Sequence, residues 1–302
     1  MAYQPSYVKL MEKGELERRA AEAMALLERC RVCPWHCEVN RQQGERGFCR
    51  AGERIRIASY GPHFGEEEVL VGEGGSGTIF FAYCNLACIF CQNYDISQEA
   101  QGSEVGSNRL AEIMLSLQKR GCHNVNLVSP THYAPQIISA VAVAAEHGLR
   151  LPIVYNCGGY EDVEMLKLLE GIVDIYMPDL KYADEAVARR LSKVKHYPEI
   201  ARKAVKEMHR QVGDLVIDDQ GLAVRGLLVR HLVLPNDLAG TKEIMRFLAR
   251  EISPNTYVNI MSQYYPAYRA WEEVDLARRV TKREYEEAVR VARGEGLWRF
   301  AD

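Results

Sequence analysis

Short apolar segments alternate with helix-like segments from residue 78 onward, and this alternation limits the fold more than any other feature of the chain. Six of the apolar segments have strand length and are rich in β-branched residues. They span residues 78–83, 125–129, 152–156, 173–177, 226–234 and 256–261. Strands that alternate with helices predict βα units, and hence a parallel sheet covered by helices.

The helix-like segments between these strands span residues 108–119, 135–146, 161–169, 183–191, 198–211 and 242–250, and a last one spans 282–293. Because six βα units are too few to close an eight-stranded barrel, we expect an α/β fold with an open sheet or a partial (β/α)6 barrel of the TIM type. In both architectures, ligands bind at the carboxyl ends of the strands. The residues that follow each strand are therefore candidates for a functional site.

The first 75 residues lack this alternation. A helix is predicted at 15–28, where Ala, Leu and Glu are frequent, followed by a cysteine-rich loop at 30–49 and a short strand near 55–59. We therefore predict two parts. Residues 1–75 form a helix and a small cysteine-rich metal-binding module, and residues 76–302 form the barrel with a C-terminal helix.

Composition excludes several classes of protein. The formal net charge of -3 gives no support for a nucleic-acid surface, which usually needs a basic face. The longest apolar run, residues 137–145, is far shorter than the roughly 20 residues that span a bilayer, and the first residues do not resemble a signal peptide. We expect a cytoplasmic protein without a membrane partner, in which the nine cysteines are metal ligands or reduced thiols.

Three cysteines follow the first predicted strand directly, in the pattern Cys84-x3-Cys88-x2-Cys91. Three thiolates can bind three irons of a [4Fe–4S] cubane, and no fourth cysteine lies close by in the sequence. An iron without a protein ligand stays open to a substrate, as catalytic metal sites require. Zinc fits less well, because structural zinc sites use four closed ligands and often paired C-x2-C spacings. The pattern predicts a catalytic iron–sulfur cluster at the carboxyl end of the sheet.

C-x3-C-x2-C after the first strand of a partial barrel resembles the radical S-adenosylmethionine (SAM) superfamily. The resemblance implies that Cys84, Cys88 and Cys91 hold the catalytic cluster and that its open iron chelates the methionine part of SAM. An electron from the cluster then cleaves SAM, and the 5′-deoxyadenosyl radical that forms abstracts a hydrogen atom. The open iron makes the cluster oxygen-sensitive, so the enzyme is expected to work under anaerobic conditions.

A closer resemblance, over roughly residues 76–265, is to pyruvate formate-lyase activating enzymes and their relatives. It rests on SGTIFF before the cysteine loop, CQNYDIS after it and PDLKY at the fourth strand. It implies an oxidoreductase that installs a glycyl radical on a partner enzyme and receives electrons from a donor such as flavodoxin or ferredoxin. Two alternatives stay open: a radical SAM enzyme that acts on a small molecule or peptide, and a non-catalytic iron–sulfur protein for electron transfer or sensing.

The same resemblance assigns SAM-binding residues after the later strands. Asp179 and Lys181 match the Asp-x-Lys of the activating enzymes, although a simple ion pair at the rim would have the same pattern. Asn156 is similar to a cofactor-facing Asn-Gly turn, or it serves only the turn itself. Gln263 follows the sixth strand, where relatives contact the ribose or adenine.

One segment departs from the superfamily. The Gly-Gly-Glu that binds the methionine amino group after the second strand is replaced here by Ser129-Pro130-Thr131-His132. The hydroxyl groups of Ser129 and Thr131 and a neutral imidazole of His132 are acceptors that can receive an amine. For His132 a capping or packing role is an equal alternative.

A second ligand set lies in the first part of the chain, as Cys30-x2-Cys33-x3-Cys37-x11-Cys49. Four thiolates within twenty residues fit Zn2+ and also fit a second [4Fe–4S] cluster. A metal would stabilise a module that has too few apolar residues to fold alone. The spacing does not decide between zinc and iron–sulfur.

Overall fold

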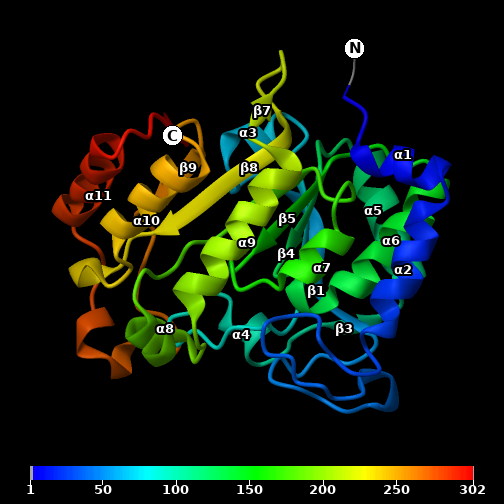
Figure 1. Cartoon of the computed structure of the whole chain (residues 1–302), viewed down its shortest axis with the longest axis horizontal. Coiled ribbons are helices and arrows are strands. Elements are labelled where there is room, and N and C mark those ends of the chain that lie inside the picture. The colour runs from blue at the N-terminus through cyan, green and yellow to red at the C-terminus, as the bar shows by residue number, and fades with distance from the viewer. Residues whose placement is uncertain (1–2, 302) are drawn as a thin grey trace.

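Six strands of one sheet run parallel and stand next to one another in the order β9-β8-β6-β5-β4-β2 (Figure 1). The computed structural model describes residues 3–301 of the chain. The bounds of these strands are β2 (Ser76–Phe81), β4 (Val125–Val128), β5 (Ile153–Cys157), β6 (Ile175–Pro178), β8 (Ala223–Leu232) and β9 (Tyr257–Met261). All six predicted strands, and the α/β class with its parallel sheet, are confirmed.

Four further strands extend or border this sheet. They are β1 (Ile55–His63), β3 (Ser103–Val105), β7 (Val216–Ile217) and β10 (Arg299–Phe300). β1 pairs antiparallel with β2 and β3 pairs with β1, while β10 continues the other end beside β9. Within residues 3–301 the terminal strands β3 and β10 do not pair with each other, so the barrel is open. β1 lies in the first 75 residues yet joins the main sheet, and the division of the chain at residue 75 stays a prediction.

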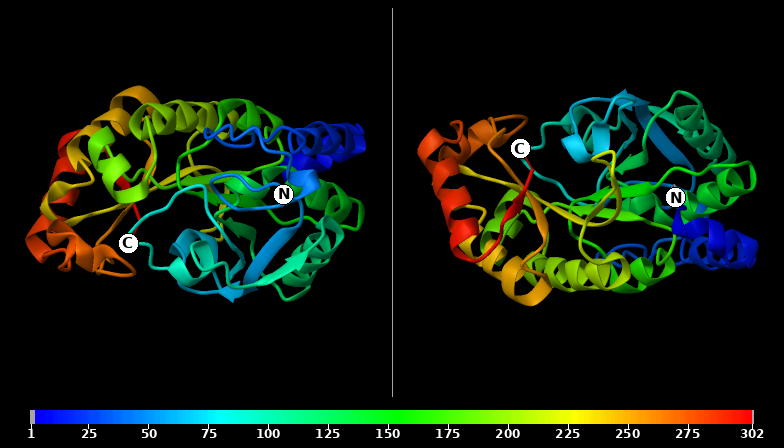
Figure 2. Two further views of the ribbon diagram at one scale, coloured as in Figure 1. Left: turned by 90° about the horizontal axis from the view of Figure 1, so that it is seen from below. Right: turned by 90° about the horizontal axis from the view of Figure 1, so that it is seen from above.

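The helices form an outer layer around the curved sheet, as the two views of Figure 2 show. The predicted ones are α2 (Glu15–Ala25), α5 (Ser107–Lys119), α6 (Ala134–Glu146), α7 (Val163–Leu168), α8 (Glu185–Ser192), α9 (Tyr197–Val212), α10 (Thr241–Phe247) and α11 (Lys282–Gly294). Several begin at a side-chain cap: Asp184 accepts from the Val187 amide, and Thr281 forms a capping box with Glu284. Sequence analysis missed the short helices α1 (Ser6–Glu12), α3 (Glu68–Val71) and α4 (Tyr94–Ser97).

The core lies between the sheet and the helices and is rich in tyrosine. Tyr155 and Tyr176 are fully buried, and each hydroxyl group has a hydrogen-bond partner. Tyr176 donates to Gln211 over 2.8 Å, so the ring is buried without leaving an unsatisfied polar group. No helix within residues 3–301 has both the length and the apolar character needed to cross a membrane.

Asp174, directly before β6, ties the N-terminal segment to the sheet. Its carboxylate accepts from the Ser6 amide at 3.0 Å, from the Ile153 amide at 3.0 Å and from the Tyr3 hydroxyl at 2.7 Å. Two of the donors belong to the N-terminal segment and the third to β5, so this one buried side chain fixes α1 against the start of β5. From there α1 and α2 pack over α6 as an additional outer layer.

Replacing Asp174 tests this link. Asp174→Ala leaves two buried amide groups without acceptors, and we expect the free energy of unfolding to fall by roughly 2 to 4 kcal/mol. Tyr3→Phe removes a single donor and should cost about 1 kcal/mol or less. Urea unfolding followed by circular dichroism measures both values. Equal losses in the two variants would contradict a shared anchoring role for the carboxylate.

Candidate active site

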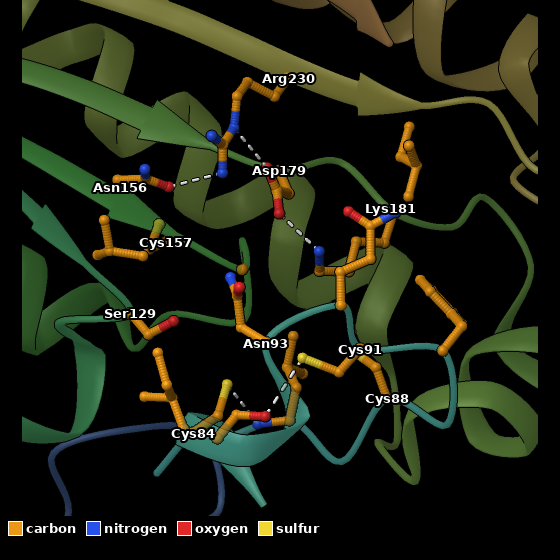
Figure 3. A pocket seen from close by; sticks show the side chains of 18 of the residues that line it. Cys84, Cys88, Cys91, Asn93, Ser129, Asn156, Cys157, Asp179, Lys181 and Arg230 are labelled. Carbon is orange, nitrogen blue, oxygen red and sulfur yellow. Dashed lines mark hydrogen bonds and ion pairs between the residues drawn. The ribbon is translucent and has the colours of Figure 1, made fainter. Parts of the chain in front are cut away.

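The carboxyl ends of the six parallel strands surround one pocket (Figure 3). Each strand, or the segment that follows it, contributes a polar or sulfur-bearing side chain to the lining. These side chains are Cys84, Cys88, Cys91, Asn93, Ser129, Asn156, Cys157, Asp179, Lys181, Arg230, Met261 and Gln263. The structure thus brings most of the residues proposed from the sequence together, although they span almost 180 positions of the chain.

The three-cysteine loop is held tightly at the end of β2. Tyr83 adopts the left-handed conformation (φ 71°), which turns the chain out of the strand directly before Cys84. The amides of Ala87 and Ile89 donate to the carbonyl groups of Ser192 and Leu191 at the end of α8. These backbone bonds fix the loop on a helix, so the three thiols have defined positions.

The thiols themselves receive hydrogen bonds from the protein. The Leu86 amide donates to Cys84 Sγ over 3.4 Å, and the Ser192 hydroxyl donates to Cys88 Sγ over 2.9 Å. Cys91 Sγ lies 3.2 Å from the Ser97 hydroxyl. Burial raises the pKa of Cys84, and it raises the pKa of Cys88 to about 11, so a thiolate here needs a cationic centre beside it.

This donor set fits an iron–sulfur cluster. Within residues 3–301, no three Cys, His, Asp or Glu side chains converge as ligands of one metal ion. A cubane has a different requirement, because each thiolate binds a separate iron. Three thiols on one short loop, with hydrogen bonds to sulfur that tune a metal centre, meet that requirement.

A network of charges lies opposite the thiols. Asp179 accepts from Lys181 Nζ at 2.6 Å and from Arg230 Nε at 2.8 Å. Burial raises the pKa of Asp179, but the two cations outweigh burial and lower it below its usual range. Asp179 is therefore a carboxylate shared by two cations, and Arg230 has a second anionic partner in Glu66 at 3.8 Å.

Arg230 is a site residue that sequence analysis missed. Its guanidinium group joins two strands, since it also donates to Asn156 Oδ1 over 2.7 Å. Asn156 is the fourth residue of β5, not part of a turn, and its side chain faces this network in Figure 3. A signal was present: Arg230 and His231 interrupt the apolar segment GLLVRHLVL, and an arginine within a core strand needs a partner.

The turn after β5 belongs instead to Gly158 and Gly159. Gly159 has a φ of 77°, and a Cβ there would lie 2.4 Å from the carbonyl oxygen of Asp179. A Cβ on Gly158 would lie 2.5 Å from Leu86 in the cysteine loop. These glycines let three segments of the pocket wall approach one another closely.

The residues predicted to replace the Gly-Gly-Glu segment separate in the structure. Ser129 lines the pocket in a left-handed conformation (φ 57°). Thr131 and His132 do not line it, because the chain turns into a 3-10 helix at Thr131–Tyr133. Thr131 donates to Glu161, and His132 Nε2 lies 2.9 Å from the Ala82 carbonyl oxygen. The geometry does not support these two as receivers of an amine.

Gln263 lies at the rim of the pocket after β9. Its backbone carbonyl group accepts a hydrogen bond from the Gln92 side-chain amide over 3.1 Å, which links the end of β9 to the cysteine loop. The position agrees with a contact to a bound molecule, and its role stays a prediction.

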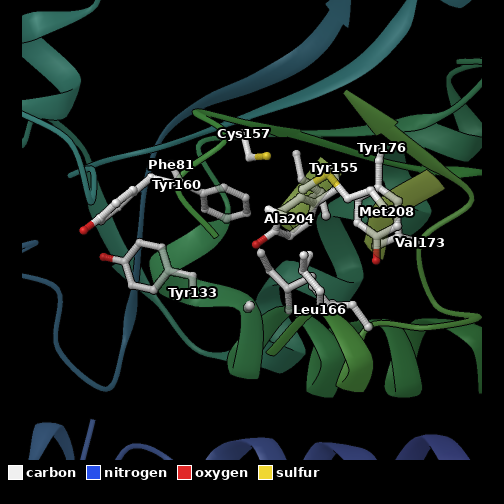
Figure 4. Close-up of a cluster of buried hydrophobic side chains, with 14 of the residues drawn as sticks. Phe81, Tyr133, Tyr155, Cys157, Tyr160, Leu166, Val173, Tyr176, Ala204 and Met208 are labelled. Carbon is white, nitrogen blue, oxygen red and sulfur yellow. The ribbon is translucent and has the colours of Figure 1, made fainter. Parts of the chain in front are cut away.

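Behind the pocket wall, Glu161 is a carboxyl group buried among neutral partners. It accepts from the hydroxyl groups of Thr131 at 2.7 Å and Tyr155 at 3.1 Å. Figure 4 shows Tyr155 beside Cys157 in this apolar layer. Burial raises the pKa of Glu161 to about 8, so the group is largely protonated at neutral pH.

Comparison with known proteins identifies similar sequences and folds. A family model described as "Radical SAM superfamily" matches residues 78–218. The uncharacterized protein MJ0674 of Methanocaldococcus jannaschii is 36% identical over 286 residues, which are 92% of this chain and 78% of that protein. MJ0808 of the same organism is 28% identical over 170 residues, 51% of this chain and 49% of that protein.

Among solved structures, Streptococcus suis SuiB bound to the precursor peptide SuiA has a TM-score of 0.51 at 15% identity. The match covers 72% of this chain and 46% of SuiB, so the chain spans about half the length of that protein. At this identity the likeness concerns the fold alone.

The buried Glu161 predicts a pH dependence of stability. The unfolded carboxyl group titrates near pH 4.3 and the folded one near pH 8, so the folded state holds an extra proton between these values. This contribution is fully present below about pH 4 and is lost as the pH rises through about 8.

Glu161→Gln keeps the shape of the side chain and removes its titration. As the pH rises from about 5.5 to 7.5, wild-type protein should lose stability relative to the variant, by on the order of 2 kcal/mol. Urea unfolding of both proteins in the metal-free form, at the two pH values, gives this difference. A stability gap that does not change with pH would show that Glu161 is ionised in the folded state.

Proposed function

The chain belongs to the radical SAM superfamily, and from this premise we propose that Cys84, Cys88 and Cys91 hold a [4Fe–4S] cluster that works on SAM in the adjoining pocket. When bound, such a cluster supplies the electron that cleaves SAM into methionine and a 5′-deoxyadenosyl radical, which takes a hydrogen atom from the substrate. The observation that carries the proposal is that the three thiols and the Asp179 network line the same pocket.

Lys181 is the residue we assign to the carboxylate of SAM. Its ammonium group lies in the pocket between Asp179 and the thiols (Figure 3), where it pairs with Asp179. A partly buried cation in a pocket binds a carboxylate strongly where water is excluded. Asp179 in turn offers its carboxylate to the positive groups of SAM, the amine or the sulfonium.

Arg230 orients this pair and does not itself need to touch SAM. From β8 it holds both Asp179, which follows β6, and Asn156 of β5, so the carboxylate keeps one position when a ligand enters.

The apolar side chains of the pocket wall have a separate role. Leu86, Phe90 and Leu232 line the same pocket and exclude water from the reactive site.

The substrate we propose first is a glycine of a partner enzyme. This rests on the sequence resemblance to activating enzymes, above all PDLKY, of which Asp179 and Lys181 line the pocket. A small molecule or peptide is the alternative class of substrate. We also propose that the protein works in the cytoplasm under anaerobic conditions and takes electrons from a flavodoxin or ferredoxin. A non-catalytic role is disfavoured, because it leaves the charges of Asp179 and Lys181 without a purpose.

The cofactor set we propose has a second member. Cys30, Cys33, Cys37 and Cys49 hold zinc or a second [4Fe–4S] cluster, as four thiols of one short segment can do.

The reaction is tested by 5′-deoxyadenosine formation from SAM in anaerobically reconstituted, reduced protein. We expect product from wild type and none from Cys88→Ala, which loses a ligand of the cluster. Lys181→Gln should keep the iron content of the wild type but bind SAM at least about tenfold more weakly, because a charge-assisted contact is lost. Lys195→Gln changes an exposed lysine in the same region and should behave like wild type.

Equilibrium dialysis with labelled SAM measures the binding in each variant. Unchanged SAM affinity in Lys181→Gln would refute the role of Lys181, and no product from a wild type with intact cluster would refute the radical reaction. Mixing active protein with a panel of glycyl-radical enzymes then tests the substrate. A glycyl-radical EPR signal supports an activating role, and its absence alongside steady 5′-deoxyadenosine formation shifts the proposal to a small molecule or peptide.

A further inference from the structure

We infer that the four N-terminal cysteines hold a second [4Fe–4S] cluster with a net negative charge, with Arg41 as its buried counter-cation, directly against the loop of the first cluster. The inference deepens the second cofactor proposed above and does not depend on the radical reaction. It rests on three features of the structure: the arrangement of the thiols, the surroundings of Arg41, and the contacts between the module and the Cys84 loop.

The segment that carries the thiols folds back on itself without regular strands. The Cys30 amide donates to the Val39 carbonyl over 3.0 Å, and the Glu38 amide donates back to the Cys30 carbonyl over 3.0 Å. This pairing brings the two ends of the first cysteine group together. Cys30, Cys33 and Cys49 are buried, and Cys37 is partly buried.

The turn at Gly47 and Phe48 packs closely around the sulfur of Cys37. The Phe48 amide donates to Cys37 Sγ over 3.4 Å, the kind of bond that thiolate ligands of metals accept. Gly47 lies so close that a Cβ there would come within 2.6 Å of Cys37 Sγ. Only a glycine lets the backbone approach this thiol, so the turn is built for Cys37 and not merely for a change of chain direction.

Arg41 supplies the independent observation. It is 1% exposed, and its guanidinium group donates to the carbonyl oxygens of Gly52 and His132. Cys30 Sγ lies 3.9 Å from one of its nitrogens. Within residues 3–301, no carboxylate forms an ion pair with Arg41.

Burial of a cation without an anion costs free energy, because neutral carbonyl groups offset only part of its lost hydration. Four protonated thiols would leave this cost in place. Four thiolates on an oxidised four-iron cluster leave the centre with a net negative charge, and such a centre beside Arg41 removes the imbalance. A cluster fits these thiols better than zinc does, because within residues 3–301 no three of them converge on a single ion, whereas a cubane binds each thiolate at a separate iron.

The module also holds the loop of the first cluster. Trp35, between two of the cysteines, donates through Nε1 to the Asn85 carbonyl over 2.9 Å and stacks on Phe48 at 3.8 Å. Arg50, directly after Cys49, donates to the carbonyl groups of Ser97 and Gln98, beside Cys91. A metal that fixes these turns therefore fixes two sides of the Cys84 loop.

The experiment starts from a variant that lacks the first cluster, with Cys84, Cys88 and Cys91 all changed to Ala. Elemental analysis of this protein after anaerobic purification reports the second centre alone. We expect about four irons per chain with an absorption band in the visible range, and loss of that iron when Cys33→Ser is added. Zinc in place of iron would overturn the assignment of a cluster.

Arg41→Gln in the same background should lose metal to a chelator at least about tenfold faster than the parent protein. Arg41→Lys, which restores the charge, should recover most of the retention, and Arg54→Gln, an exposed arginine, should have no effect. Impairment of Arg41→Lys as severe as that of Arg41→Gln would mean that the shape of the side chain matters and not its charge, which overturns the role of Arg41.

Absence of iron from the variant without the first cluster would overturn the second cluster itself. This outcome is distinct from a failure of the proposed function. Wild-type protein that makes 5′-deoxyadenosine while the cluster-free variant binds no metal refutes only the inference, and the reverse pattern refutes only the radical reaction.

Discussion

Parallel pairing of six strands is the constraint on which the rest of the molecule depends. Parallel strands all end at the same edge of the sheet, so segments that are remote in the sequence meet there. The register places Phe80, Val128 and Asn156 opposite one another on β2, β4 and β5. The residues that follow each of them open into the same pocket. Without this alignment the cysteine loop and Asp179 would have no common site.

Within that site, one shared carboxylate sets the electrostatics. Asp179 pairs with both Lys181 and Arg230, and Arg230 also pairs with Glu66 at 3.8 Å. Lys181 is the cation of this network on the side of the thiols. At the N-terminal cysteines, Arg41 is a buried cation that pairs with no carboxylate within residues 3–301. In both places a cation beside the thiols indicates that a negatively charged group is bound there.

The sequence predicted the features that depend on local patterns. Apolar periodicity located the six strands to within a few residues, and the cysteine spacing located the loop after β2. A charge within an apolar segment marked Arg230 as unusual, but its partners depend on the pairing of β8 with β6, which no local pattern encodes. Thr131 and His132 were placed in the pocket because they follow a strand. The 3-10 turn at Thr131–Tyr133 instead directs them into the protein interior.

The central claim is that three cysteines leave one iron of the cluster open to the methionine part of SAM. Electron–nuclear double resonance on reduced protein with SAM labelled by 15N at the methionine amine tests it most directly. The account predicts a 15N coupling to the cluster that is replaced by a 14N coupling with unlabelled SAM and is absent from Cys88→Ala. An intact reduced cluster that binds SAM but shows no such coupling would contradict it.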